Sequence, residues 1–224
     1  MSSSLLSAEA AAQRLDAIRS SLPEGCRLLA VSKGQPAAAV RALAAAGQRS
    51  FAESRLQEAA AKQQDLADWP DLDWHFIGRL QANKVRPVLQ RFSTIHSLDS
   101  LALAERLARI ADEEGCSPQV FAQVKLRPDP AKGGFELEEL RRHWPALQRL
   151  APLRLNGLMT MAPLGLDQAG RQALFQDAAA LAAELGAAEL SMGMSGDWPE
   201  AAAAGSTWVR IGSALFGERQ PCQR

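Results

Sequence analysis

The stretch that decides the fold is Arg27-Leu28-Leu29-Ala30-Val31-Ser32-Lys33-Gly34-Gln35-Pro36. Its four consecutive apolar residues show no alternation with polar ones, which is typical of a strand buried on both faces in a parallel sheet. Pro36 suits the first turn of a following helix, where a missing N–H costs nothing. The pattern predicts Lys33 at the carboxyl end of a core strand, the end at which α/β proteins carry their chemistry. A lysine in such a place is usually solvated, so its role depends on the rest of the chain.

The same succession of a short apolar segment and an amphipathic segment repeats along the chain. Further strands are expected at 50–53, 72–77, 92–97, 119–126, 153–160, 189–192 and 207–211. Helices are expected at 36–46, 55–67, 80–90, 100–114, 136–150, 167–185, 198–204 and 213–216, with an extra N-terminal helix at 7–22. These βα units predict an α/β fold, a single-domain (β/α)8 TIM barrel. An open doubly wound sheet is the alternative.

The length of 224 residues leaves no room for a second domain beside such a barrel. We expect one cofactor-binding barrel domain over 1–224, with a core at about 27–217, the leading helix within 1–22 and a tail at 218–224.

The charge balance argues against two classes of partner. Lys+Arg and Asp+Glu both number 25, so the formal net charge is zero. A general binder of nucleic acid or of anionic membranes needs an excess of positive charge, so neither partner is expected. No apolar run is long enough to span a bilayer, and the N-terminal residues do not have the pattern of a signal peptide.

The three cysteines, Cys26, Cys116 and Cys222, are scattered and form no CxxC pair or Cys/His cluster. Neither a disulfide framework nor a metal site is therefore expected. This usage is typical of a reducing compartment, so we expect a cytoplasmic protein.

Small polar turns follow the last two predicted strands. Met194-Ser195-Gly196 offers a hydroxyl and backbone N–H groups, and Gly212-Ser213 offers the same at the start of a short helix whose dipole favours an anion. Barrels bind phosphate groups at these two loops. The turns predict a phosphate site, the alternative being that each glycine only serves a tight turn.

A phosphate site that faces a strand-end lysine suggests pyridoxal 5′-phosphate, which forms a Schiff base with lysine through its aldehyde. Arg210, at the end of the last strand, could donate to the ring nitrogen of this cofactor. An arginine can only donate, so the nitrogen would stay unprotonated and the ring would be a weak electron sink. Arg210 could equally bridge loops or pair with Glu53.

Several segments together resemble the family of pyridoxal phosphate homeostasis proteins (YggS/PROSC-like). The resemblance runs in order from about Leu28 to Gly217, and the segments that carry it are Ala30-Val31-Ser32-Lys33, Phe51-Ala52-Glu53-Ser54-Arg55-Leu56-Gln57-Glu58, Trp74-His75-Phe76-Ile77-Gly78-Arg79-Leu80-Gln81-Ala82-Asn83-Lys84, Ile95-His96-Ser97-Leu98-Asp99, Gly157-Leu158-Met159-Thr160-Met161, Leu190-Ser191-Met192-Gly193-Met194-Ser195 and Val209-Arg210-Ile211-Gly212-Ser213-Ala214-Leu215-Phe216-Gly217.

The resemblance implies a barrel like the N-terminal domain of alanine racemase, with pyridoxal 5′-phosphate held on Lys33. It implies a role in holding or buffering this cofactor and supplying it to other enzymes, with no established turnover and no catalytic residues. Phosphate contacts are implied for Ser195, Gly212 and Ser213, and a ring-nitrogen contact for Arg210. The remaining residues expected at the cofactor are Ser54, His75 and Met194.

Two positions depart from the family's pattern. The family's usual Phe-Gly-Glu-Asn-Tyr is Phe51-Ala52-Glu53-Ser54-Arg55 here, and Ser54 is too short for the contact that asparagine makes with the cofactor face. Lys125 stands on a strand where the family usually carries asparagines. It could be a second acceptor for the aldehyde if it points inward, but a solvated outward lysine is favoured.

A weak amino-acid racemase of the alanine racemase type is the alternative function. Such an enzyme needs a base on each face of the substrate carbon, and a tyrosine from a second domain of the partner subunit supplies one of them in those racemases. This sequence has no tyrosine. A scaffold that has lost the cofactor is disfavoured by the lysine and the phosphate turns, and the absence of a dimerisation domain favours a monomer.

Overall fold

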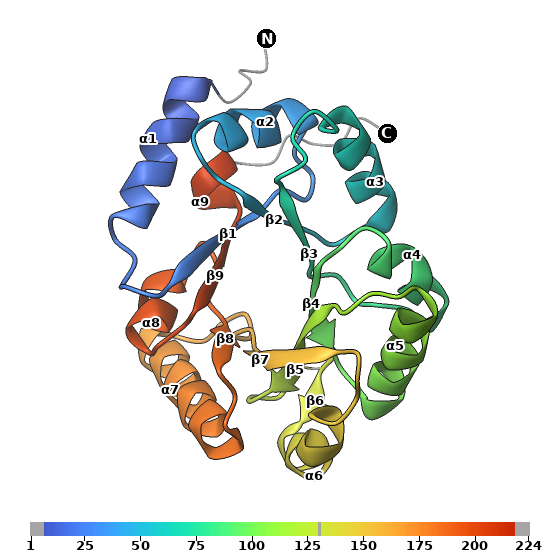
Figure 1. Cartoon of the computed structure of the whole chain (residues 1–224). Coiled ribbons are helices and arrows are strands. Elements are labelled where there is room, and N and C mark those ends of the chain that lie inside the picture. Colours follow the sequence, from blue (N-terminus) through green and yellow to red (C-terminus); the bar gives the residue numbers. More distant parts are fainter. Residues whose placement is uncertain (1–6, 130, 218–224) are drawn as a thin grey trace.

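A computed structural model of the chain describes residues 7–129 and 131–217. Within these residues, eight parallel strands form one ring (Figure 1). The ring order is β1 (Arg27–Val31), β2 (Ser50–Glu53), β3 (Asp73–Phe76), β4 (Thr94–Leu98), β5 (Gln119–Lys125), β7 (Arg154–Met159), β8 (Glu189–Ser191) and β9 (Trp208–Ile211). The ring is closed because β4 pairs with β5 and β9 pairs with β1. The predicted TIM barrel is confirmed, and the open sheet is wrong.

Helices form the outer layer around this barrel (Figure 1). They are α1 (Ala8–Arg19), α2 (Ala37–Ala45), α3 (Leu56–Asp65), η1 (Ala82–Lys84), α4 (Val85–Leu89), α5 (Leu101–Glu113), α6 (Leu137–Leu147), α7 (Gln168–Leu185), α8 (Trp198–Ala203) and α9 (Ser213–Phe216). Polar caps fix several starts: Ser7 accepts from the Ala10 N–H at 3.1 Å, and Asp167 accepts from the Gly170 N–H at 2.8 Å. The expected leading helix is confirmed, and the expected tail at 218–224 lies outside the described residues.

Two segments differ from the sequence-based expectation. The helix expected at 80–90 is a 3₁₀ turn followed by the short α4, in which Pro87 cannot donate a backbone hydrogen bond. A further short strand, β6 (Phe135–Glu136), pairs with the last two residues of β5, beyond the part of β5 that pairs with β7. Two residues are too few to produce a periodic signal. The sequence therefore predicts a helix from residue 136, whereas Glu136 belongs to β6 and α6 begins at Leu137.

The strands separate two apolar layers. On β1, Leu28 and Ala30 pack in the larger cluster between strands and helices, whereas Leu29 and Val31 belong to a smaller cluster inside the barrel. The other buried members of the inner cluster are Ala52, Phe121, Met159 and Trp208. Polar side chains fill another part of the barrel interior, where His75, His96 and Ser191 are buried and bonded to one another.

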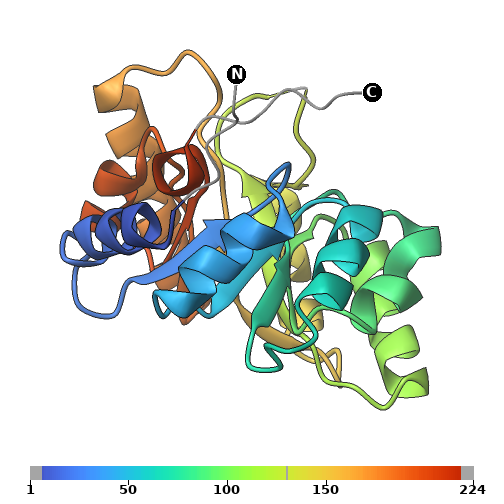
Figure 2. The ribbon, with the colours of Figure 1, turned by 90° about the horizontal axis from the view of Figure 1, so that it is seen from above.

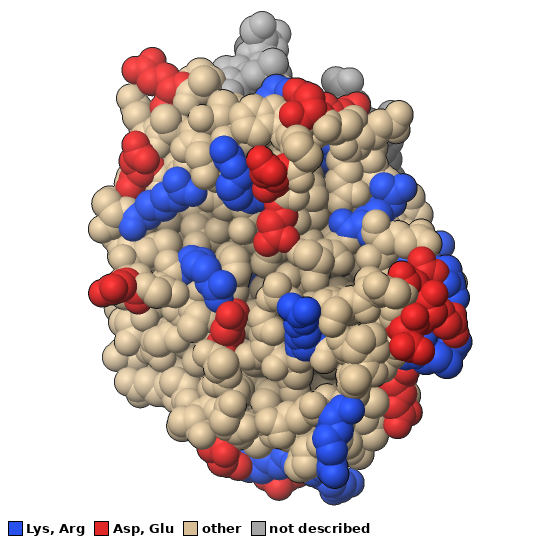
Figure 3. All heavy atoms as spheres, viewed as in Figure 1, with Lys and Arg blue, Asp and Glu red and all other residues tan. Residues whose placement is uncertain are grey.

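Loops at the carboxyl ends of the strands form the mouth of the barrel. Figure 2 shows the loop between β5 and β6 and the loop between β7 and α7 rising on the same side. Lys132 joins them, since its Nζ donates to Ala162 O at 2.8 Å. Figure 3 shows acidic and basic side chains intermixed over the face seen in Figure 1. In the described part of the chain, no helix is long and apolar enough to cross a membrane.

Candidate functional site

Lys33 stands in the turn after β1, at the carboxyl end of the strand as predicted, and its side chain is partly exposed. The preceding Ser32 is fully buried and tied to β2: its N–H donates to Ala52 O at 3.0 Å and its Oγ donates to Glu53 Oε1 at 2.6 Å. Gly34 has a φ of +74°, which a side chain would strain. The lysine therefore projects from a sharp turn that the neighbouring strand holds.

Two side chains of α3 hold the backbone on both sides of this lysine. Lys62 Nζ donates to Ser32 O at 2.6 Å, to Glu53 Oε1 at 2.6 Å and to Glu58 Oε1 at 2.7 Å. The Gly34 N–H donates to the same oxygen of Glu58 at 2.5 Å. We call Ser32, Glu53, Glu58 and Lys62 the Lys62 cluster. It fixes the position from which the Lys33 side chain starts.

The electrostatics of the Lys62 cluster are those of a buried site. Burial raises the pKa of the Glu53 carboxyl, although Lys62 and Ser32 oppose the rise. Burial also pushes up the pKa of Glu58, but the bonds from Lys62 and the Gly34 N–H outweigh it, so that pKa is lowered. Among the described residues, Glu53 Oε2 is buried without a hydrogen-bond partner. Such an oxygen beside the lysine turn could accept from a polar group of a ligand.

The two predicted phosphate turns lie against each other. Ser195 Oγ accepts from the Gly212 N–H at 3.2 Å and from the Ala214 N–H at 3.4 Å, so a hydroxyl of one turn sits on the first N–H groups of α9. Ser213 is exposed, and the Met194 N–H is held by Asp197 Oδ1 at 2.6 Å. The turns thus bring a hydroxyl and backbone N–H groups together, although Ser195 Oγ already accepts from two of these N–H groups in this structure.

Arg210 is a buried cation at the end of β9, with 4% of its surface exposed. It donates to Ser191 O at 2.6 Å, to Ser191 Oγ at 2.8 Å and to Thr160 O at 2.9 Å. Burial lowers its pKa to about 10, so it stays charged at neutral pH. These bonds join the ends of β7 and β8, so Arg210 bridges two strand ends, and its contact with a ring nitrogen stays a prediction. The pairing with Glu53 is wrong, since that carboxylate pairs with Lys62.

Comparisons with known proteins place the chain in a family. The profile of the alanine racemase N-terminal domain matches residues 6–220. The pyridoxal phosphate homeostasis protein of Synechocystis sp. is 49% identical over 208 residues, which cover 90% of this chain and 95% of that protein. The protein of the same name from Pseudomonas aeruginosa is 46% identical over 200 residues, which cover 88% of this chain and 86% of that protein. The chain belongs to the pyridoxal phosphate homeostasis protein family.

Solved structures agree with this membership. The structure of PipY of Synechococcus elongatus with PLP bound is 53% identical, has a TM-score of 0.89, and is matched over 92% of this chain and 100% of that chain. An alanine racemase of Clostridium difficile shares only the fold, at 17% identity and a TM-score of 0.75, and the match covers 58% of that chain. This member of the homeostasis protein family therefore has the alanine racemase N-terminal fold.

The remaining predicted residues lie at different depths in the barrel. Ser54 is half-buried after β2, and the loop after β3 packs so closely on it that a Cβ at Gly78 would be 2.1 Å from Ser54 O. His75 lies inside the barrel, where its ring nitrogens bond to Asp73 at 2.6 Å and to His96 at 2.8 Å. A direct contact of His75, Ser54 or Met194 with a cofactor stays a prediction.

Lys125 forms an ion pair with Glu136 of β6. The pairing directs this amine toward the short strand beside β5, which agrees with the solvated alternative. Glu58 and Lys62 were not predicted, because a Glu and a Lys four residues apart usually form an exposed helical pair. The available signal was the helical spacing, since Lys62 falls on the same stripe as the buried Ala59 and Leu66.

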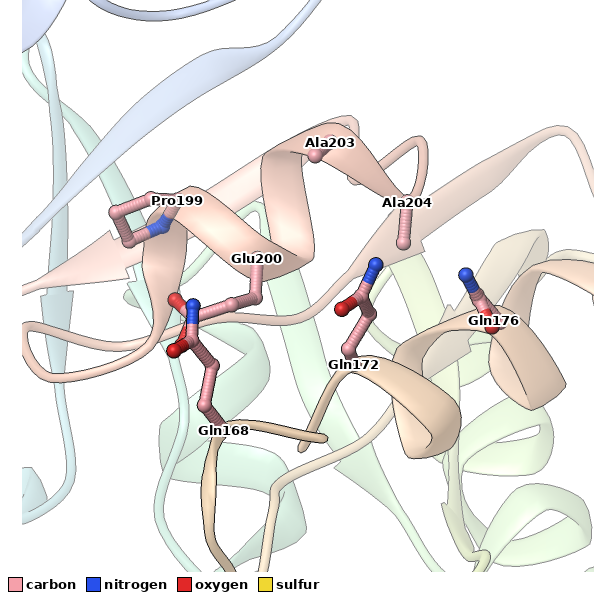
Figure 4. A pocket seen from close by; sticks show the side chains of 7 residues that line it. All are labelled: Gln168, Gln172, Gln176, Pro199, Glu200, Ala203 and Ala204. Carbon is pink, nitrogen blue, oxygen red and sulfur yellow. The ribbon is translucent and has the colours of Figure 1, made fainter. Parts of the chain in front are cut away.

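Two further features of the described residues were compared with the mouth of the barrel: a surface groove and possible metal ligands. A groove of about 550 Å³ lies between α7 and α8 on the outer layer, and Figure 4 shows Gln168, Gln172 and Gln176 of α7 facing α8 there. Within the described residues, no group of three or more His, Cys, Asp and Glu side chains is arranged to hold a metal ion. The candidate site of this homeostasis protein family member is therefore the mouth at Lys33, Ser195 and Arg210.

Proposed function

We propose that this protein binds pyridoxal 5′-phosphate, holds it as a Schiff base on Lys33, and buffers or supplies it inside the cell without efficient catalysis of its own. The observation that carries the proposal is the arrangement of the mouth in a chain 49% identical to a pyridoxal phosphate homeostasis protein. There, the Lys62 cluster holds the turn of Lys33, and Ser195 joins the two phosphate turns. We place this role in the cytoplasm and expect a monomer.

The donor set fits this cofactor. An amine on a fixed turn suits an aldehyde, a hydroxyl beside backbone N–H groups suits a phosphate, and a buried arginine suits a ring nitrogen that accepts. The orphaned Glu53 Oε2 adds an acceptor near the lysine. When bound, the cofactor supplies an aldehyde carbon that amines attack reversibly.

Each residue then has a distinct task. Lys33 holds the aldehyde end, Ser195 with Gly212 and Ser213 binds the phosphate, and Arg210 fixes the ring by donating to its nitrogen. Bonds to Ser191 and Thr160 occupy three of the five guanidinium N–H groups, so Arg210 has donors beyond those that anchor it. Because arginine keeps the ring nitrogen unprotonated, this set of residues favours holding the cofactor over carbanion chemistry.

One feature of the sequence favours a carrier over a racemase. The sequence has no tyrosine to act as the second base. Turnover of amino acids at about 1 s⁻¹ or more, the range of ordinary enzymes, would contradict the carrier function.

Cofactor attachment can be tested directly. Protein loaded with pyridoxal 5′-phosphate should absorb visible light, and borohydride should fix the cofactor onto the peptide that contains Lys33. The variant Lys33→Ala should lose both signals, whereas the matched variant Lys125→Ala should keep them. Label on Lys125, or a colourless loaded protein, would contradict the assignment.

Delivery needs a separate experiment. Loaded protein is mixed with an apo-enzyme that depends on pyridoxal 5′-phosphate, and recovery of that enzyme's activity is followed with time. Faster recovery than with the same amount of free cofactor indicates direct transfer. Recovery at the rate set by spontaneous release indicates buffering only.

A further inference from the structure

A series of hydrogen bonds crosses the barrel interior from the mouth toward the opposite end. Arg210 Nη1 donates to Ser191 Oγ at 2.8 Å, and Ser191 Oγ lies 2.9 Å from His96 Nδ1. His96 Nε2 lies 2.8 Å from His75 Nδ1, and His75 Nε2 lies 2.6 Å from Asp73 Oδ2. We call these five residues the interior network. It joins β8 and β9 to β3 and β4, which lie far from them in the sequence.

With both rings neutral, the two ends of the interior network fix the direction of every bond in it. Arg210 can only donate, so Ser191 Oγ accepts from it and can give its own hydrogen to His96 Nδ1. A neutral His96 then carries its hydrogen on Nε2 and donates to His75 Nδ1. His75 in turn donates from Nε2 to the carboxylate of Asp73, which can only accept. With both rings neutral, this is the one arrangement of hydrogens that satisfies all four contacts, whereas an imidazolium at His75 would reverse the bond between the rings and place the hydrogen of His96 on Nδ1.

A charged imidazolium would break this arrangement. Both nitrogens of a charged His96 donate, so Ser191 Oγ would receive two donors and its own hydrogen would need another acceptor. His96 is fully buried, and burial is the main reason that its pKa lies well below the usual 6.5, with the nearby cations Arg210 and Arg27 acting in the same direction. The geometry and the burial agree on a neutral ring.

Aromatic packing holds both rings in place. The His96 ring stacks on Phe121 with centroids 4.5 Å apart and an angle of 9° between the planes. The His75 ring meets the edge of Trp208 at 5.1 Å, and Arg27, which also pairs with Glu189, covers that indole at 4.0 Å. A half turn of either ring would keep these ring contacts but replace each bonded nitrogen by carbon, so the hydrogen bonds decide which nitrogen faces which partner.

We propose that Ser191, His96 and His75 are positioning residues for Arg210. They keep Ser191 Oγ an acceptor toward the guanidinium, so Arg210 is bonded to two strand ends in one orientation. Asp73 at the far end sets the direction of the network. The consequence for cofactor binding rests on the proposed function, whereas the arrangement of hydrogens does not.

The arrangement can be read by NMR on the protein without cofactor. The sequence has three histidines, so long-range ¹H–¹⁵N spectra contain few imidazole signals, and the variant His143→Gln identifies that of His143 on α6. At neutral pH, His96 should be neutral with its hydrogen on Nε2. A hydrogen on Nδ1 of His96, whether that ring is neutral or charged, would overturn the proposal.

The effect on Arg210 is tested with two matched variants of His96. His96→Asn keeps an acceptor near the position of Nδ1, whereas His96→Phe keeps the stacking on Phe121 but leaves Ser191 without its acceptor. Titration with pyridoxal 5′-phosphate should show about tenfold weaker binding for His96→Phe, as for the loss of one hydrogen bond near a charge, and recovery of most of that loss in His96→Asn. Thermal unfolding followed by circular dichroism confirms that both variants fold.

Equal affinities for these two variants would contradict the positioning role. If the unaltered protein itself fails to bind pyridoxal 5′-phosphate, the proposed function fails, while the NMR spectra alone still decide whether the interior network exists as described.

Discussion

At the scale of single residues, Lys62 shows how a buried charge shapes the site. It is 5% exposed, and it joins the carboxylates of Glu53 and Glu58 to the backbone next to Lys33. A buried pair of this kind is weak evidence for net stability, because removing both charges from water is costly. Its specific effect is geometric, since it fixes the turn from which the reactive amine projects.

Replacing this lysine should therefore be severe. In Lys62→Met the buried Glu53 loses its cationic partner, and removal of one partner of a buried pair costs about 3–5 kcal/mol in the free energy of unfolding. Urea denaturation measures this loss. The double variant Glu53→Gln/Lys62→Met should recover part of it, because the uncompensated charge is then absent.

The matched control is the exposed pair of Arg41 and Asp68. Arg41→Met should change the urea midpoint only slightly, because solvent screens an exposed pair. If Lys62→Met and Arg41→Met shift the midpoint equally, the Lys62 cluster does not have the importance assigned to it.

The sequence identifies some site residues better than others. For Lys33, Ser195 and Arg210 the sequence could predict the place at a strand end, because each follows or ends a strand, whereas their contact with a cofactor stays a prediction. Lys62 and the interior network could not be predicted, since their contacts depend on which side of a helix or strand faces the neighbour. His75 was predicted at the cofactor from its strand, but its depth in the barrel depends on the register with β4.

At the scale of elements, the turn between β8 and α8 depends on one glycine. Gly193 has a φ of +89°, and a Cβ there would lie 2.6 Å from Ala201 Cβ and 3.0 Å from Trp198 Cα. Both neighbours belong to α8, so the close approach sets the distance between this helix and the turn that carries Ser195. The proposed phosphate site thus depends on the packing of a neighbouring helix.

Gly193→Ala should destabilise the protein by more than the roughly 1 kcal/mol expected from an unfavourable φ alone, because α8 must also shift. It should also weaken binding of pyridoxal 5′-phosphate. Gly205→Ala is the matched control, since its φ is +93° but a Cβ there meets nothing within 4 Å. Comparable losses of stability in the two variants would show that contact with α8 is unimportant.

Element boundaries were predictable where the chain carries strong local signals. The limits of β2 and α9 agree with the expected segments at 50–53 and 213–216. In contrast, β6 exists only because Phe135 and Glu136 meet the end of β5, a contact between segments that no local pattern encodes. Pro87 was visible in the sequence, but not the division of its helix into η1 and α4.

At the scale of the whole molecule, the barrel interior combines apolar side chains with hydrogen-bonded polar ones. The inner apolar cluster has few members, and the interior network occupies the space beside it. Burying His96 without charge makes the stability of the entire barrel depend on pH, because unfolding returns this ring to water. The sign of the dependence follows from the direction of its pKa shift.

His96 has a folded-state pKa well below 6.5, its value when exposed, chiefly because of burial. Below about pH 6.5 the unfolded chain therefore binds a proton that the folded barrel does not, so stability is fully present above this pH and is lost as the pH falls. One such group contributes a slope of up to about 1.4 kcal/mol per pH unit in the free energy of unfolding.

Urea unfolding measured between pH 7 and pH 5 should show this slope, reduced in His96→Phe and unchanged in His143→Phe. The raised pKa of Glu53 acts in the opposite direction, but it is common to all three proteins and cancels in the comparison. Equal slopes for the unaltered protein and His96→Phe would mean that His96 takes up a proton within the barrel, which the single arrangement of hydrogens in the interior network does not allow.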